Sequence, residues 1–182
     1  VDVDFEYSLK LFKGTNEHAG RYDIIVAYEG TDEEAQGYLR RTFEDPKTSL
    51  FATKPFADNE DMFNIYYVLV PEISYKDVFC PIHRRSFSIE DIERFEKVKK
   101  YSWADNYIFV SKSKEVWPHV TGDTVKLSSV CNDAPIVSIH EMGHSIGGLA
   151  DEYIVNEDAM AFGGFVNCAL SEENARSKWG EV

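Results

Sequence analysis

The sequence predicts an α/β (α+β) fold in which helices pack on one mixed, twisted sheet. Apolar runs rich in Ile, Val and Tyr alternate with stretches that carry helix-start signals, as expected of packed helix and sheet layers. The chain has 182 residues, of which 43% are hydrophobic, so it can bury a sizeable core. We expect a weakly structured lead-in over residues 1–20 and a single domain over residues 21–182.

The first half of the chain is expected to form a strand, a helix and a second strand. A continuous apolar run predicts a strand over Tyr22–Tyr28. Thr31 is followed three residues later by Glu34, which is the capping-box pattern, so a helix should begin there and run toward Glu44. A run rich in Tyr, Val and Ile predicts the second strand over Phe63–Val70.

The second half is expected to add another helix and two shorter strands before a long apolar helix. Ser88 and Asp91 are suited to open a charged helix that runs through about Lys100. Shorter runs of strand character cover Asn106–Ser111 and Thr124–Ser129. This alternation supports the α/β class.

The long helix carries the most informative motif of the chain, His-Glu-x-x-His. Residues four apart lie on the same helix face, so His140 and His144 can offer two imidazole nitrogens to one Zn²⁺. The carboxylate of Glu141 can reach a water at the open coordination position and act as its general base. The motif therefore predicts metal-assisted amide hydrolysis.

The surroundings of the motif favour a buried helix with a sharp end. Pro135 follows Asn132 and Asp133, as is common at helix starts. Gly147 and Gly148 allow the positive φ values that let a chain turn after its last helical residue. A broad apolar surface is expected from Ile136, Val137, Ile139, Met142 and Ile146.

The third metal ligand is expected just after this turn. Asp151 is the nearest carboxylate, and we favour it, although an aspartate there can also cap a helix or turn. Glu152 is the next donor along the chain. A ligand from a later helix would be Glu172 or Glu173.

The stretch from His140 to Tyr153, H-E-M-G-H-S-I-G-G-L-A-D-E-Y, resembles the signature H-E-x-G-H-S-x-x-x-L-A-D-E-Y of peptidase family M64, named after a bacterial immunoglobulin A peptidase. The segment Asp23–Glu34 resembles the first strand, glycine turn and acidic helix start of that family. Further similar segments, which extend the likeness over about residues 20–182, are Pro55-Phe56, Phe63–Val68, Asn167-Cys168 and Lys178-Trp179.

The resemblance implies a zincin-like catalytic domain of a secreted protein, which cleaves peptide bonds of protein substrates. Zincins place an edge strand beside the metal-binding helix, where extended substrate binds by main-chain hydrogen bonds, and Thr124–Ser129 is the expected edge strand. Family members continue beyond this C terminus, so we expect a domain fragment or a short member. Residues 71–107 depart from the family, and loops that shape the substrate site are expected to differ there.

Two other functions remain open from the residues. The chain could be a catalytically inactive, zinc-stabilised module that binds peptide or glycoprotein, or a structural domain without metal. Glu141 argues against the inactive module, because a metal site kept only for structure needs no general base. His18, His83 and His119 have no helical partner histidine and are expected to be structural.

Composition limits the possible partners. The formal net charge of −13 argues against nucleic acid or anionic membranes, which would repel the chain. No apolar run approaches the length of a membrane span. Cys80, Cys131 and Cys168 contain no C-x-x-C pair, so no cysteine zinc site is expected, whereas a bridge from Cys131 to either of the others and three free thiols both remain open.

Overall fold

The computed structural model describes residues 8–70, 95–113, 116, 118–130, 133–149 and 176–177. The strand and helix composition of these residues confirms the expected α/β class. In chain order the elements are β1 (Lys10–Lys13), β2 (Tyr22–Glu29), α1 (Asp32–Phe43), η1 (Leu50–Ala52), η2 (Phe56–Met62), β3 (Phe63–Val70), η3 (Lys97–Lys100), β4 (Asn106–Ser111), β5 (His119–Thr121), β6 (Thr124–Ser128) and α3 (Ala134–Gly147).

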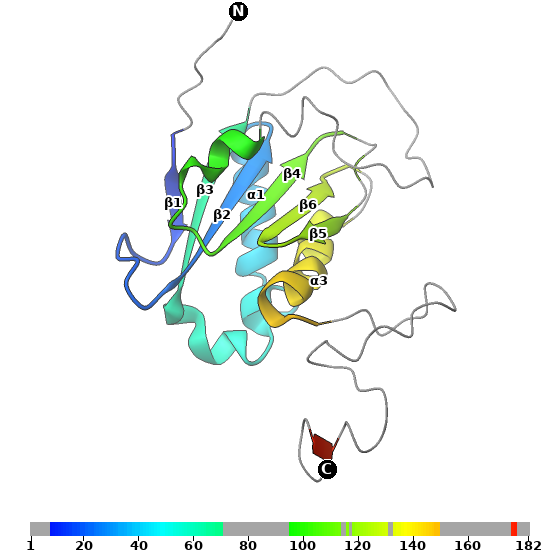
Figure 1. Ribbon diagram of the computed structural model, residues 1–182. Coiled ribbons are helices and arrows are strands. Elements are labelled where there is room, and N and C mark those ends of the chain that lie inside the picture. Colours follow the sequence, from blue (N-terminus) through cyan, green and yellow to red (C-terminus); the bar gives the residue numbers. More distant parts are fainter. Residues whose placement is uncertain are drawn as a thin grey trace, which may run out of the picture.

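The strands form one six-stranded sheet in the order β1-β3-β2-β4-β6-β5 (Figure 1). β2, β3, β4 and β6 run parallel to one another. β1 and β5 are antiparallel to their neighbours and form the two edges. The sheet is therefore mixed, as the sequence predicted.

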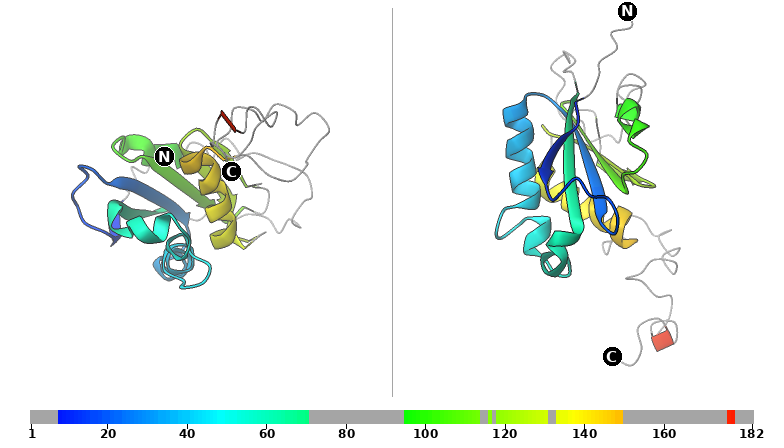
Figure 2. Two further views of the ribbon diagram at one scale, coloured as in Figure 1. Left: turned by 90° about the horizontal axis from the view of Figure 1, so that it is seen from below. Right: turned by 90° about the vertical axis from the view of Figure 1, so that its left-hand side faces the viewer.

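Strand β2 lies near the middle of the sheet and is covered on both faces. Ile24 and Val26 point into one core, and Ile25 and Ala27 point into the other. Helices α1 and α3 cover the first face, and η3 lies over the second (Figure 2). Because both faces are buried, the strand is a continuous apolar run instead of an alternating one, which made it recognisable in the sequence.

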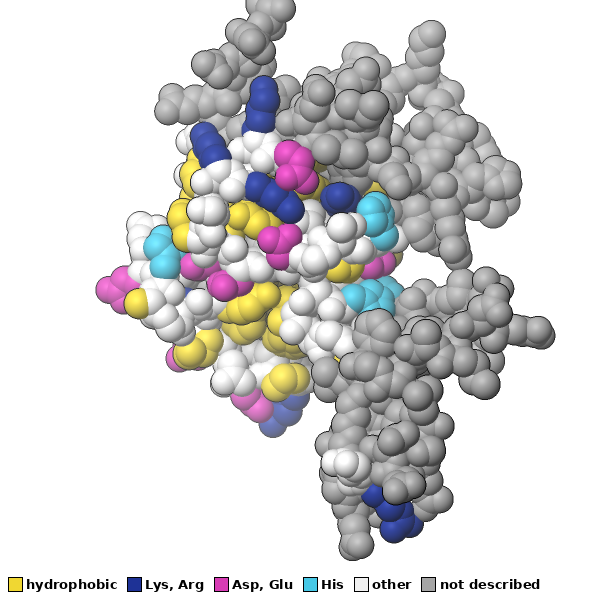
Figure 3. Space-filling view, viewed as in Figure 1, with side chains coloured by type: hydrophobic (Ala, Val, Ile, Leu, Met, Phe, Trp, Pro, Cys, Tyr) yellow, Lys and Arg dark blue, Asp and Glu magenta, His cyan; other side chains and the backbone are white. Residues whose placement is uncertain are grey.

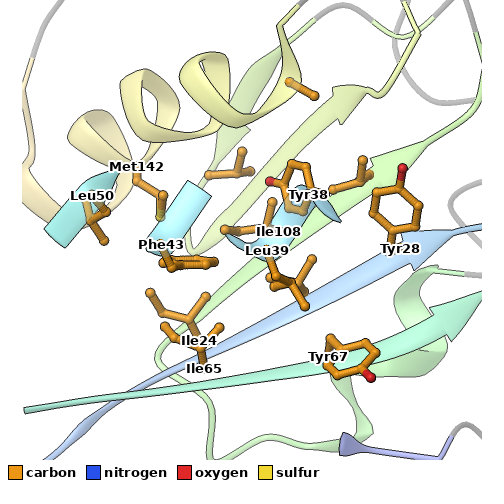
Figure 4. Close-up of a cluster of buried hydrophobic side chains, with 14 of the residues drawn as sticks. Ile24, Tyr28, Tyr38, Leu39, Phe43, Leu50, Ile65, Tyr67, Ile108 and Met142 are labelled. Carbon is orange, nitrogen blue, oxygen red and sulfur yellow. The ribbon is translucent and has the colours of Figure 1, made fainter. Parts of the chain in front are cut away.

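The core beneath α1 and α3 packs α3, the helix that carries the His-Glu-x-x-His motif, against the sheet. Leu39 and Phe43 of α1 and Met142 of α3 are fully buried there, against Ile24 and Ile108 of the sheet (Figure 4). Burying each such side chain stabilises the fold by roughly 1.5–3 kcal/mol. The position of α3 therefore depends on both α1 and the sheet.

Helix α1 begins with the predicted capping box. The Thr31 side chain accepts a hydrogen bond from the Glu34 backbone N–H, and the Glu34 carboxylate accepts one from the Thr31 backbone N–H. The helix ends at Phe43, with Glu44 as its C-cap, close to the predicted end. Thr31 and Glu34 together satisfy two donors that the first turn leaves unpaired.

Two expectations about the sheet edges are wrong. The lead-in expected over residues 1–20 contributes β1, whose Leu11 pairs with Tyr66 of β3. β1 is short, partly exposed and rich in lysine, so no apolar alternation marks it in the sequence. The edge strand expected at Thr124–Ser129 is β6, which is paired on both sides, and the true edge beside it is β5.

The helix expected over residues 88–100 lies mostly outside the described residues. Its last turn is the 3-10 helix η3, and Phe95 and Val98 are buried in the second core. None of the helices in the described ranges is long and apolar enough to cross a bilayer.

Candidate metal centre

The start of α3 is fixed by a distant arginine. Pro135 lies in the first turn, as predicted, but the Asp133 side chain makes no capping hydrogen bond. Both Asp133 carboxylate oxygens instead accept hydrogen bonds from Nη2 of Arg41 on α1, at 2.7 and 2.9 Å. The beginning of the motif helix is thereby tied to the neighbouring helix.

A second hydrogen bond between the two helices is buried. The Ser138 hydroxyl donates to the Ala134 carbonyl at 2.7 Å, so the Tyr38 hydroxyl donates to Ser138 Oγ. Both side chains are buried, and burial raises the pKa of the Tyr38 phenol far above its ordinary value. Tyr38 therefore stays a neutral donor at any ordinary pH.

The apolar surface expected on α3 is only partly buried. Met142 is fully buried, whereas Ile136 is 51% exposed. Ile139 and Ile146 are partly buried and pack against the core. The expectation of a broad buried surface is therefore wrong at Ile136, although Ala134 and Pro135 in the same turn are buried.

The two motif histidines converge as the spacing predicted. Nε2 of His140 lies 3.2 Å from Nε2 of His144, and their rings are nearly perpendicular, with centroids 4.8 Å apart. Two nitrogens bound to one tetrahedral Zn²⁺ at 2.0–2.1 Å lie about 3.3–3.4 Å apart. The separation of the two nitrogens is therefore close to that of a pair bound to one zinc ion.

The hydrogen bond at the other ring nitrogen sets the tautomer of His144. Nδ1 of His144 lies 2.6 Å from the carbonyl oxygen of Leu149. A carbonyl oxygen only accepts, so Nδ1 carries the proton and the neutral ring keeps a lone pair on Nε2. That lone pair faces His140, which is the orientation a metal ligand needs.

The helix ends in a left-handed turn at one of the two predicted glycines. Gly148 has φ 60° and ψ 28°, and its N–H donates to the His144 carbonyl at 3.1 Å. Gly147 remains the last helical residue. The turn returns Leu149 toward the helix, where its N–H donates to the Gly143 carbonyl at 3.2 Å.

The predicted base lies on the same helix as the two histidines. Glu141 is only 8% exposed, although it follows the exposed His140 directly. On the face shown in Figure 3, histidine side chains lie on the right-hand side, in the region of β5 and α3, and also on the opposite side. Edge strand β5 packs beside α3, so the motif helix lies next to this edge of the sheet.

Several predicted residues lie outside the described part of the chain. These are Asp151, Glu152, Glu172, Glu173, Cys80, Cys131, Cys168 and His83. Among the residues that the structure does describe, no three His, Cys, Asp or Glu side chains gather in a metal-binding group. The third ligand therefore stays a prediction.

The remaining histidines have different surroundings. His18 lies 2.8 Å from the buried carboxylate of Asp23 through Nδ1, and its ring packs against Trp103 with centroids 4.1 Å apart. These contacts are those of a structural histidine. His119 lies on β5, across from Lys126 of β6.

Sequence reasoning did not identify three residues that organise the motif helix: Tyr38, Arg41 and Leu149. Tyr38 and Arg41 contact α3 across 100 and 92 positions of sequence, and no local pattern reports such contacts. For Leu149 a signal existed, because an apolar residue just after a helix-ending glycine often folds back onto the last turn.

Comparison with known proteins does not identify the chain. No protein-family model matches it, and no curated protein matches it either.

Proposed function

We propose that the protein is a zinc-dependent endopeptidase that hydrolyses peptide bonds of protein substrates. The observation that carries the proposal is the 3.2 Å separation of the two Nε2 atoms of His140 and His144 within a His-Glu-x-x-His helix. The mixed sheet, its antiparallel edge strand and the position of the helix after β6 suit a zincin-like domain. The resemblance of the motif region to peptidase family M64 supports the same function.

The residues have distinct roles in this proposal. His140 and His144 bind the ion, and Asp151 supplies the expected third ligand. Bound Zn²⁺ lowers the pKa of water to about 7 and polarises the substrate carbonyl. Glu141 takes the proton of the attacking water and passes it to the leaving amine.

The edge strand β5 offers the substrate a backbone template. Thr121 and Thr124 flank a two-residue turn and face each other, and Val120 faces Val125. Flanking residues of such a hairpin form the hydrogen-bonded pair, so the N–H and C=O of Val120 point away from β6. An extended peptide can pair with Val120 while its next side chains alternate between the two faces of the sheet.

The first test measures metal content and hydrolysis in parallel. We expect about one zinc per wild-type chain. His144→Ala should lose the ion, and His119→Ala, a histidine outside the motif, should keep it. Glu141→Gln should keep the zinc and lose about 10²- to 10⁴-fold in kcat/KM on a cleavable peptide.

Each other outcome has a definite meaning. Zinc in wild type together with full activity of Glu141→Gln would overturn the proposed mechanism. Zinc without hydrolysis of any peptide in a library would favour the inactive binding module. A chain that takes up no zinc when it is supplied would overturn the metal centre itself.

A further inference from the structure

We infer that Leu149 is a positioning residue that holds His144 in its metal-binding tautomer. We also infer that position 147 is a glycine because a larger side chain there would displace Leu149. This inference rests on the proposed zinc site and adds to it the residue that orients one ligand. It concerns a backbone carbonyl and an apolar side chain, neither of which belongs to the His-Glu-x-x-His pattern.

Three contacts hold Leu149 against the end of α3. Its carbonyl oxygen accepts the hydrogen bond from Nδ1 of His144 at 2.6 Å. Its N–H donates to the Gly143 carbonyl at 3.2 Å. Its side chain is 37% exposed and lies over Gly143 and Gly147. The left-handed turn at Gly148 makes this return of the chain possible.

The two helical glycines leave different amounts of space for Leu149. A Cβ added at Gly147 would lie 3.1 Å from Leu149 Cγ, which is tighter than ordinary contact. A Cβ added at Gly143 would lie 3.5 Å from Leu149 Cδ1, an ordinary van der Waals distance. Gly147 is helical and needs no left-handed backbone, so the close approach of Leu149 explains this glycine.

The chemical consequence follows from the short hydrogen bond. While the carbonyl of Leu149 accepts from Nδ1, the neutral ring carries its proton on Nδ1 and not on Nε2, and the hydrogen bond holds the ring in its orientation. Moving Leu149 by a few tenths of an ångström would lengthen that bond. His144 would then populate the Nε2–H tautomer, which cannot bind the ion. Loss of such an orienting partner typically weakens metal binding about 10- to 100-fold.

The two glycines supply a matched pair of variants for the test. Gly147→Ala and Gly143→Ala each add one methyl group within α3, and both remove a glycine of low helix propensity. We would measure the zinc dissociation constant by competition with a chelator, and the tautomer of His144 in the metal-free protein by ¹⁵N NMR of the imidazole. Gly147→Ala should bind zinc about 10- to 100-fold more weakly and lose the Nδ1–H signature. Gly143→Ala should keep both properties of the wild type.

Leu149 itself gives a second pair if Gly147→Ala fails to fold. Leu149→Ala removes the packing over the glycines and should also lose zinc affinity and the Nδ1–H signature of His144. Leu149→Met retains the volume of the side chain and should keep both properties. Wild-type zinc affinity and an unchanged His144 tautomer in Gly147→Ala or Leu149→Ala would overturn the inference. If the wild type binds no zinc, the proposed function fails, and the NMR comparison of metal-free proteins still decides the role of Leu149.

Discussion

The two helices on the same face of the sheet are stabilised at their N termini in opposite ways. α1 is capped by its own residues, since Thr31 and Glu34 exchange hydrogen bonds across its first turn. α3 has no such cap, because the Asp133 carboxylate binds Arg41 of α1. The helix that carries the candidate metal ligands thus depends on its neighbour, and the neighbour depends on local sequence.

This difference explains how a five-residue motif becomes a candidate site. The spacing of His140 and His144 guarantees a shared helix face, but it does not place that helix in the molecule. Tyr38 and Arg41 of α1 form hydrogen bonds with the start and the second turn of α3. The two motif histidines are therefore positioned by tertiary contacts, and changes in α1 should disturb them.

The largest predicted effect tests how α3 is attached to the core. Met142→Ala removes a fully buried side chain and should destabilise the protein by about 2–5 kcal/mol in urea denaturation. Ile136→Ala is the control on the same helix, because this half-exposed side chain should cost less than about 1 kcal/mol. Equal losses would mean that the Ile136 side chain is buried in solution.

The next effect concerns the buried hydroxyl pair between the helices. Ser138→Ala leaves the Tyr38 hydroxyl without this acceptor and should cost about 1–3 kcal/mol. Tyr38→Phe should cost about 0.5–1.5 kcal/mol, since Ser138 keeps its bond to Ala134. The double variant should be more stable than Ser138→Ala alone, because neither buried partner is then unsatisfied. Additive losses in this thermal-unfolding cycle would show that the two groups do not interact.

Sequence pattern predicted the interior of the sheet well and its edges poorly. Strands β2 and β3 are runs of β-branched and aromatic residues, and β3 has the predicted bounds. β1 and β5 have four and three residues and partly exposed side chains. Their strand conformation comes from pairing with β3 and β6, and such pairing leaves no local pattern in so short a segment.

The candidate site divides in the same way. Helix geometry predicted that His140 and His144 would lie together, and the structure places them so. The carbonyl of Leu149 could not be predicted from residue type, because every residue carries one. Periodicity likewise gave the apolar positions of α3 but not which of them face the sheet. Asp151 stays a prediction from the resemblance and from proximity in sequence.

The contrast between the helix starts can be tested directly. Thr31→Ala removes the side-chain cap of α1 and should cost about 1 kcal/mol. Asp133→Ala at the corresponding position of α3 removes only an exposed ion pair and should cost about 0.2–1 kcal/mol, with a cost that falls as salt is added. A salt-independent loss for Asp133→Ala as large as that of Thr31→Ala would mean that Asp133 also caps its helix.

The smallest predicted effect is the acid dependence of the α1 cap. The hydrogen bond from the Thr31 backbone, followed by the contact with Lys112, lowers the pKa of Glu34 from its ordinary value of 4.5. A lowered folded-state pKa adds stability above pH 4.5, and this contribution is lost as the pH falls through the folded value. Glu34→Gln keeps a capping side chain but does not titrate, so its stability deficit against wild type should shrink on acidification. Because Glu34 is exposed, the change should stay below about 0.5 kcal/mol.

Glu33→Gln, in the same turn but outside the capping box, is the control. An equal pH-dependent change in that variant would assign the effect to the helix dipole instead of the cap.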